Sequence, residues 1–244
     1  MLAFVPCLFA QQPAAGASSV PDSPPTHQES APTGTAAAFI GYATNRSILF
    51  PDIATSAGPM TTGQKFKLFI NQSISPPYIV LAGLSAAFNQ ARDVPAGYGQ
   101  GWDGYASRFG ANMARASSNS FFGTFVFASM LHQDPRFFPQ SHPSLWGSVK
   151  YSADRVVFTR SDAGSDEFNT SGVLAPLAAE SLANTYLPDS ERTVGKTAKR
   201  FAIDLCWQFG GNMFKNYWPT LFRNMGLNRL KVLPTPETVE DHPR

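Results

Sequence analysis

The sequence predicts an all-α fold, a single bundle of about six helices. Apolar residues recur at helical spacing in several segments, and signals for helix starts precede them. Aromatic residues, with 20 Phe among them, make up 13% of the chain and supply bulky material for a core. Charged residues make up only 15%, below the roughly 25% that is usual in soluble proteins. We therefore expect the 244-residue chain to bury much of its surface or to lie against something apolar.

Two helix starts are predicted in the first half of the chain. Thr61 and Gln64 have the spacing of a capping box, and an apolar segment follows them. Ser75 followed by Pro76 is a second start signal, because proline is favoured at the first helical position. It leads into a segment of apolar and small residues, 78–88.

Apolar periodicity predicts two longer helices and three shorter ones. One long helix begins at Trp102, and its apolar face comprises Trp102, Tyr105, Phe109 and Met113. The other begins near Glu191 and ends or kinks near Pro219, and its apolar stripe comprises Val194, Ala198, Phe201, Leu205, Phe209 and Met213. Shorter helices are predicted over 118–132, 145–160 and 172–186, and a strand competes at 156–159.

Four segments are predicted along the chain. Residues 1–10 resemble the apolar part and cleavage site of a secretory signal peptide, truncated because its basic start is missing and expected upstream. Residues 11–36, rich in Pro, Ala and Ser, are predicted to be a disordered spacer, since they hold too little apolar surface to offset the entropy of ordering. Residues 37–230 are the predicted helical domain, and 231–244 a flexible tail.

Small residues recur every four positions in two predicted helices. One ridge comprises Ala106, Gly110, Ala114 and Ser118, and another comprises Ala82 and Ala86. Such ridges let helix backbones approach closely, either inside a tight soluble bundle or in a helix pair that faces a membrane. Both interpretations stay open. The longest apolar runs, 78–88 and 121–131, have about eleven residues, fewer than the roughly 18 of a spanning helix, so no conventional transmembrane helix is predicted.

The polar segment 132–138 carries the candidate catalytic residues, His132, Asp134 and Arg136. His132 and Asp134 could form an acid–base pair, and Arg136 could hold an anionic group. We favour a structural role, in which Asp134 before Pro135 forms the turn at a helix exit. In that role Arg136 pairs with a neighbouring carboxylate or carbonyl.

Two further sets of residues are interpreted as structural. Glu180, Asn184 and Tyr186 add polar groups to the last of the shorter helices and could face inward. Cys206 has apolar neighbours and is expected to be a buried, unreactive thiol.

Several functional classes are excluded by the sequence. The net charge is only +2 and the basic residues are spread out, which argues against nucleic acid as a partner. The glycines of segment 98–105 follow no predicted strand, so no nucleotide-binding loop is predicted. Histidine and cysteine pairs at metal-binding spacing are absent, as are nucleophile motifs, so no metal or cofactor is predicted.

Four motifs resemble a group of exported bacterial envelope proteins of unknown function. They are YGQGWDGYASRFG (98–110), HQDPRFF (132–138), VVFTRSD (156–162) and NMFKNYWP (212–219). The shared pattern covers about residues 40–225. The resemblance implies a single helical unit and export, and it implies no catalytic residue.

Together these features predict a non-enzymatic protein of the periplasm or outer-membrane surface that docks at a membrane through aromatic and small-residue faces. Its expected partner is membrane lipid or another envelope protein. One alternative is an envelope enzyme centred on His132, Asp134 and Arg136, and another is a carrier of an apolar ligand held between Phe-rich helices. An enclosed apolar cavity would favour the carrier. An exposed apolar patch larger than a few hundred Å² would favour docking.

The mature protein is expected to begin at or near Gln11 and to lie outside the cytoplasm, because cleavage after Ala10 would remove the apolar leader. Amino-terminal sequencing of the native protein measures this directly. Cytoplasmic protein that retains Met1 to Ala10 would contradict the prediction.

Overall fold

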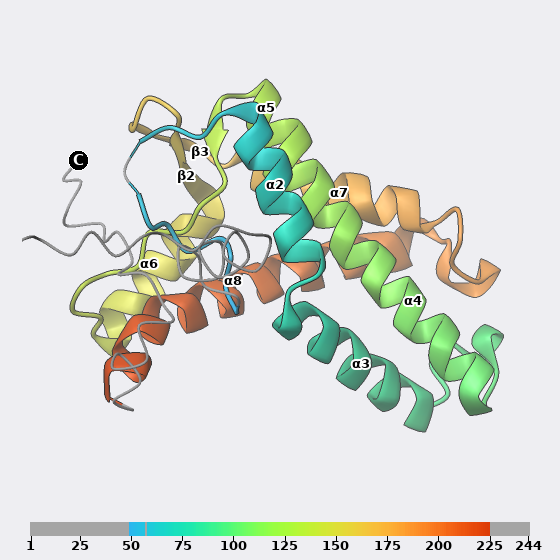
Figure 1. Cartoon of the computed structure of the whole chain (residues 1–244). Coiled ribbons are helices and arrows are strands. Elements are labelled where there is room, and N and C mark those ends of the chain that lie inside the picture. Colours follow the sequence, from blue (N-terminus) through green and yellow to red (C-terminus); the bar gives the residue numbers. More distant parts are fainter. Residues whose placement is uncertain (1–48, 57, 225–244) are drawn as a thin grey trace, which may run out of the picture.

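A computed structural model describes residues 49–56 and 58–224 and is mostly helical (Figure 1). In chain order its elements are α2 (Thr62–Ser73), α3 (Pro76–Ala91), a 3-10 turn (Ala96–Tyr98), α4 (Gly101–Ser120), a π-helix (Phe121–Phe127), α5 (Ala128–Met130), β1 (Gln133–Asp134), α6 (Leu145–Val157), β2 (Phe158–Ser161), β3 (Asp166–Phe168), α7 (Thr170–Ala183), a second 3-10 turn (Asp189–Glu191) and α8 (Val194–Asn224). Within the described residues, six α-helices have 12 residues or more. The predicted leader, spacer and tail (1–10, 11–36 and 231–244) lie outside the described residues.

Both predicted helix starts in the first half of the chain are confirmed. α2 follows the N-cap Thr61, whose hydroxyl accepts a hydrogen bond from Gln64 N at 3.3 Å, while Gln64 Oε1 accepts one from Thr61 N at 2.8 Å. This reciprocal pair satisfies two amide groups that would have no partner in the first turn. α3 follows the N-cap Ser75 and has Pro76 as its first residue.

The fold departs from an all-α bundle in a small antiparallel sheet with the strand order β1-β2-β3. Gln133 of β1 lies opposite Ser161 of β2. The helix predicted over 145–160 ends at Val157, and the chain continues directly into β2. The β-branched and aromatic residues at 156–159 explain this change, because such side chains favour a pleated strand.

Of the two outcomes predicted at Pro219, an end or a kink of the helix, the end is wrong, because α8 continues through this residue. Proline in a helix removes one backbone hydrogen bond and strains the preceding turn. Here the rings of Phe214 and Trp218 stack at 5.7 Å between centroids, and both pack against Phe50. These ring contacts hold the turn that Pro219 would otherwise weaken.

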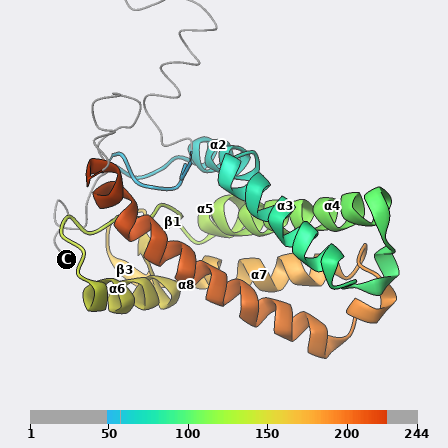
Figure 2. The same cartoon turned by 90° about the horizontal axis from the view of Figure 1, so that it is seen from below.

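α4 and the π-helix that continues it form the centre of the fold. α2, α3 and α7 pack against this continuous helix, and α8 packs against α6 and α7 (Figure 2). A methyl group added to Gly123 of the π-helix would lie 2.9 Å from Ala175 Cβ of α7. The helices of the described residues pack closely against one another, because their buried apolar side chains are mostly alanine. These are Ala82, Ala86, Ala111, Ala128, Ala175, Ala179 and Ala183.

The two ridges of small residues have different surroundings. Ala82 and Ala86 of α3 are buried where α3 packs on α4, as in a tight bundle. Ala106 and Gly110 of α4 are exposed, and a methyl group added to Gly110 would meet no described atom within 4 Å. The helix face that carries Gly110 is therefore open to solvent or to a partner.

Several of the largest fully buried side chains are charged or polar. Lys65 of α2 is 1% exposed, donates a hydrogen bond to Ala128 O at 3.0 Å and pairs with Asp162 at 2.7 Å. Arg108 of α4 is 2% exposed and donates hydrogen bonds to carbonyl oxygens of the connection between α3 and α4, those of Val94, Pro95 and Gly99. Each charge is satisfied by a distant segment, which fixes that segment against a helix.

The expectation that Cys206 is buried is wrong, because its thiol is free and exposed. α8 turns a different side inward, where Asn216 Nδ2 donates a hydrogen bond to Ser148 Oγ of α6 at 2.8 Å. Ten positions separate Cys206 from Asn216, so at 3.6 residues per turn Cys206 lies about 80° around the helix axis from Asn216. Apolar neighbours in the sequence therefore do not imply burial here, since α8 is apolar on more than one side.

Candidate functional site

The three candidate residues His132, Asp134 and Arg136 do not converge. Asp134 and Arg136 form a nearly buried ion pair, with 2.5 Å between Arg136 Nη2 and Asp134 Oδ2 and with side chains 7% and 4% exposed, for Arg136 and Asp134 respectively. The side chain of His132 is exposed, and its backbone has a left-handed φ of 55°. The His132 carbonyl accepts a hydrogen bond from Asp162 N at 2.7 Å. Asp134 is thus paired with a neighbouring arginine, as the structural interpretation expects.

Arg136 also ties the segment before α2 to β1, since it donates hydrogen bonds to Ser56 O at 2.8 Å and Gly58 O at 2.7 Å. A cavity of about 280 Å³ lies beside it. The lining mixes polar Gln64 and Arg136 with apolar side chains such as Leu68. This mixed lining differs from the enclosed apolar cavity that a carrier of an apolar ligand requires.

A second polar cluster joins α4, α7 and α8 around Glu180, which is fully buried. Arg115 of α4 donates from Nε to Glu180 Oε1 at 2.6 Å. Arg200 of α8 donates from Nε to the other oxygen, Oε2. Each carboxylate oxygen therefore has a guanidinium partner from a different helix. Of the three residues that could face inward, Glu180 is fully buried, Asn184 is partly buried and Tyr186 is exposed.

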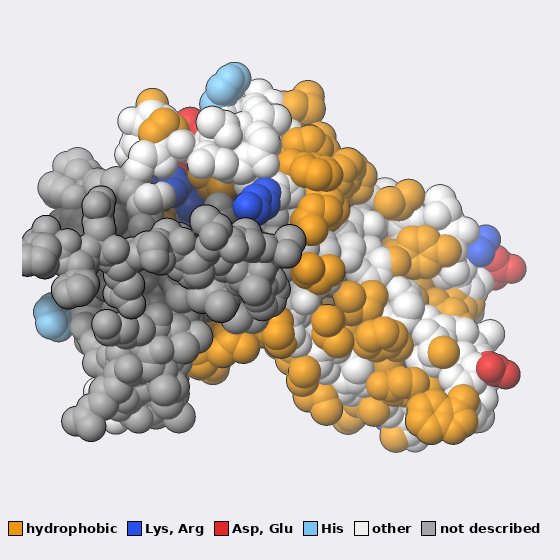
Figure 3. Space-filling view, in the orientation of Figure 1, with side chains coloured by type: hydrophobic (Ala, Val, Ile, Leu, Met, Phe, Trp, Pro, Cys, Tyr) orange, Lys and Arg blue, Asp and Glu red, His pale blue; other side chains and the backbone are white. Residues whose placement is uncertain are grey.

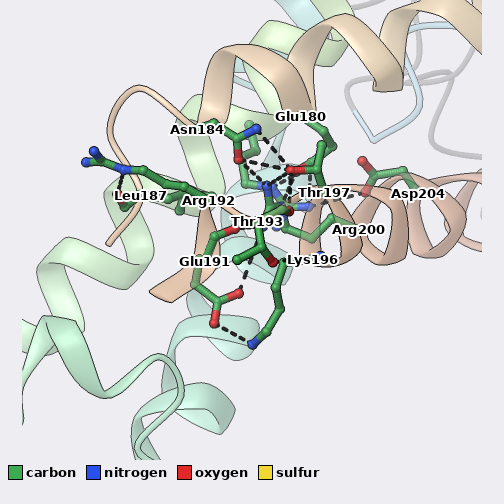
Figure 4. Close-up of polar contacts among 11 residues, drawn as sticks. Glu180, Asn184, Leu187, Glu191, Arg192, Thr193, Lys196, Thr197, Arg200 and Asp204 are labelled. Carbon is green, nitrogen blue, oxygen red and sulfur yellow. Dashed lines mark hydrogen bonds and ion pairs between the residues drawn. The ribbon is translucent and has the colours of Figure 1, made fainter. Parts of the chain in front are cut away.

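The cluster extends toward the start of α8, where Asn184 of α7 faces Thr197 and Arg200 (Figure 4). Arg200 Nη2 donates to Asn184 Oδ1 at 2.8 Å, and its Nη1 donates to Glu191 O at 2.7 Å. Lys196 pairs with the Glu191 carboxylate at 2.8 Å. These contacts fasten the first turns of α8 to the end of α7 and to the turn between them.

Asp204 adds a second carboxyl group to the cluster. Its pKa is raised from the ordinary value of 3.8 to about 7, and burial is the largest cause. The charge of Glu180 and a hydrogen bond to that residue also raise the pKa, whereas the charges of Arg115 and Arg200 lower it. Arg115 Nη2 lies 3.5 Å from Asp204 Oδ1, and the Asp204 side chain is 21% exposed. Asp204 is therefore a carboxyl group that exchanges its proton with solvent near neutral pH.

Paired carboxyl groups in different protonation states are common in acid–base sites. In this cluster both oxygens of Glu180 are bound by arginines, and the residue is fully buried, so neither oxygen faces a substrate. The geometry fits a clamp between helices that carries one exchangeable proton. Within the described residues, His, Cys, Asp and Glu side chains form no group of three or more that could hold a metal ion.

Sequence reasoning missed Arg115, Arg200 and Asp204 as members of this cluster. A usable signal existed, because Glu180 is the only charged residue of α7 and an isolated charge in an apolar helix requires a partner. The partners themselves lie 65 and 20 positions away in the chain. Spacing along the chain could not identify them.

An exposed apolar surface lies on the consecutive helices α2 and α3. We define the α2–α3 face by its side chains between 40% and 66% exposed, Phe66, Ile70, Ile74, Ile79, Val80, Leu81, Leu84 and Phe88. Figure 3 shows apolar side chains gathered over α2, α3 and the adjoining α4. Residues 68–91 contain no charged residue. At the end of α3, Arg92 stacks on the Phe88 ring at 5.2 Å.

α2 has the reverse of the usual amphipathic pattern. Its inner side buries Lys65, Leu68 and Gln72, and Gln72 Oε1 accepts a hydrogen bond from Thr124 Oγ1 of the π-helix at 2.7 Å. Its outer side exposes Phe66 and Ile70. A helix on the surface of a soluble protein normally turns its polar side to water. The α2–α3 face therefore exposes large apolar side chains from both helices.

The apolar helices of the described residues do not reach the length and hydropathy of a membrane-spanning segment. No protein-family model, curated protein or solved structure matches the chain significantly. The functional assignment consequently rests on the geometry of the chain's own residues, the α2–α3 face above all.

Asp134→Ala is expected to lower the free energy of unfolding by about 1 to 3 kcal/mol, because it leaves the Arg136 guanidinium without its charged partner. His132→Asn is the matched control, since asparagine tolerates the left-handed backbone and the side chain there is exposed. Denaturant unfolding measures both variants. Equal stability of Asp134→Ala and the wild type would contradict the structural role.

Asp204→Asn is expected to become more stabilising relative to the wild type as the pH rises from 4 to 7. The folded-state pKa of Asp204 is raised, so its contribution to stability is present below the unfolded pKa and is lost as pH rises through about 7. Thermal unfolding across this pH range measures the difference. Asp204→Glu keeps a titratable carboxyl group and should retain the wild-type pH dependence. A difference between Asp204→Asn and the wild type that does not vary with pH would refute the assignment.

Proposed function

We propose that this chain is an exported, non-enzymatic protein of the bacterial cell envelope that docks on a lipid bilayer through the α2–α3 face. The observation that carries the proposal is the set of eight large apolar side chains exposed on two consecutive helices, within a segment almost free of charge. Full burial of a large apolar side chain is worth about 1.5–3 kcal/mol. Eight half-exposed side chains therefore offer on the order of 10 kcal/mol to an apolar partner before the costs of binding.

Lipid fits this face better than a protein partner does. A protein interface of ordinary size carries roughly one hydrogen bond per 100–200 Å² and a polar rim. The exposed side chains of α3 are apolar or small except for Ser85, and the helix has no charged residue. The hydrocarbon layer of a bilayer offers no hydrogen-bond partners. A surface of apolar side chains has no hydrogen-bonding groups that would be left unsatisfied there.

The dimensions of the face favour a helix lying in the bilayer interface. α3 has 16 residues, which at 1.5 Å per residue gives about 24 Å, less than the roughly 30 Å hydrocarbon thickness. An interfacial helix buries its apolar side to a depth of about 5–10 Å and leaves the rest in water. The buried polar contacts of α2 face the protein interior, where they would stay shielded after docking.

Export is proposed from the sequence features of the chain. The apolar run 2–10 before a Pro/Ala/Ser-rich stretch supports a secretory leader. The four motifs within 98–219 support a relationship to exported envelope proteins of unknown function. A role as a docking protein at the periplasmic or outer-membrane surface accounts for both the sequence features and the α2–α3 face.

Leu84→Glu is expected to weaken binding to phosphatidylcholine vesicles by tenfold or more, because a charged group would have to enter the apolar layer at a cost of about 2 kcal/mol or more. Vesicle co-sedimentation of the purified full chain measures the partitioning. Val194→Glu is the matched control, since Val194 is 86% exposed on α8 and outside the α2–α3 face. It should bind like the wild type.

Bound protein should be released from membranes by detergent and retained in high salt, because apolar attraction is not screened. A wild-type chain that stays in the supernatant with these vesicles would overturn the proposal. Equal loss of binding in Leu84→Glu and Val194→Glu would overturn the assignment of the face.

A further inference from the structure

The first half of α8, residues 194–208, is attached to the rest of the chain mainly by polar contacts. Among these residues, all of which the structure describes, no side chain is buried. The buried side chains described in α8 are Asn212 and Asn216, and both lie in its second half. The first half therefore has no buried apolar side chain to hold it against α7, so its attachment depends on charged and hydrogen-bonded groups.

Arg200 makes the central contacts of this attachment (Figure 4). Its guanidinium donates to Glu180 Oε2 and, at 2.8 Å, to Asn184 Oδ1, both of α7. A third hydrogen bond goes to the Glu191 carbonyl at 2.7 Å. Glu180 supplies the negative charge among these acceptors, so the charge on Glu180 is what holds the first half of α8 to α7.

Asp204 brings a second carboxyl group against Glu180. Arg115 Nη2 contacts Glu180 Oε1 and lies 3.5 Å from Asp204 Oδ1, so one guanidinium nitrogen of α4 adjoins both groups. The two carboxyl groups are also hydrogen-bonded to each other. Two ionised carboxylates cannot form such a bond, because neither has a hydrogen to donate. The pair therefore shares one proton when this contact is made.

The charged groups that face Asp204 come from α4, α7 and α8. They are Arg115, Glu180 and Arg200. Tyr98 and Tyr186, from the neighbouring connections, interact with Arg115, and burial is the largest cause that raises the pKa of each, so both stay neutral near pH 7. Both arginines bind Glu180 directly, whereas Asp204 has only the longer contact to Arg115. A charge on Asp204 is therefore poorly compensated and lies beside that of Glu180.

We propose that the proton shared by Glu180 and Asp204 is a latch, which holds the first half of α8 against α4 and α7 and releases it when the proton leaves. Loss of the proton removes the hydrogen bond between the two groups and places two like charges side by side. Arg115 and Arg200, which join the three helices through Glu180, then have two competing carboxylates to satisfy.

The direction of the pH dependence follows from the raised pKa of Asp204, about 7 in the folded chain. A raised folded-state pKa means that the proton stabilises the closed latch below the pKa of the opened state, which for an exposed Asp is about 4. This stabilisation is lost progressively as the pH rises from about 4 to about 7. The latch is closed in acid and loosened at neutral pH. It involves no residue of the α2–α3 face and is independent of the docking proposal.

Amide hydrogen exchange of the purified full chain at pH 5 and pH 7, read by mass spectrometry, tests the latch. After correction for intrinsic exchange rates, the protection of residues 194–208 should fall by tenfold or more between the two pH values. α2 should remain at least tenfold more protected than residues 194–208 at pH 7, because the latch opens without unfolding the whole chain.

Asp204→Asn keeps an amide that can donate to Glu180 and has no titratable proton, so its residues 194–208 should have the same protection at both pH values. Asp189→Asn is the matched control, since the Asp189 side chain is 93% exposed in the turn before α8, and it should retain the wild-type fall. Wild-type protection that does not change between pH 5 and pH 7 overturns the proposal without any variant. A fall that survives in Asp204→Asn overturns it as well. Equal protection of α2 and residues 194–208 at pH 7 also overturns it, because α8 then opens only when the whole chain unfolds.

Discussion

Glu180 receives one arginine from α4 and one from α8, and the packing of these two helices against α7 depends on these two ion pairs. A fully buried carboxylate without partners would cost several kcal/mol, so the three helices gain stability only when they meet in this arrangement. With α4 held against α7, the helices α2 and α3 that pack on α4 turn their outer sides away from the centre. With α8 held against α7, one side of α8 is packed and the other is left free.

The interior that surrounds this contact is made largely of alanine and polar groups. Alanine buries little apolar area, so hydrophobic stabilisation per residue is small compared with a core of leucine or phenylalanine. Lys65, Arg108 and Glu180 supply directional contacts in its place. Lys65 and Glu180 reach segments more than 60 positions away, whereas Arg108 contacts the connection between α3 and α4. Buried polar contacts can select one arrangement of helices, because every alternative leaves a charge unpaired. Many of the large apolar side chains lie on the surface instead of in the interior.

The features that could be predicted from the sequence are the local ones. The start of α2 depends on Thr61 and Gln64, three positions apart, so a pattern in the sequence contains all the groups involved. The Lys65–Asp162 pair joins residues 97 positions apart and depends on the whole fold. Of the sheet, only a competing strand at 156–159 was predicted, which overlaps β2. β1 and β3 were not predicted, since each is too short to give an alternating pattern.

In the candidate site, too, only the local feature could be predicted from the sequence. The inward position of Glu180 follows from an isolated charge in an apolar helix, whereas Arg115, Arg200 and Asp204 come from two other helices. Cys206 shows the opposite error. Its apolar neighbours suggested burial, but hydrophobic periodicity identifies an apolar side of a helix without saying what covers it. A helix such as α8, apolar on two sides, can bury only one of them against its own chain.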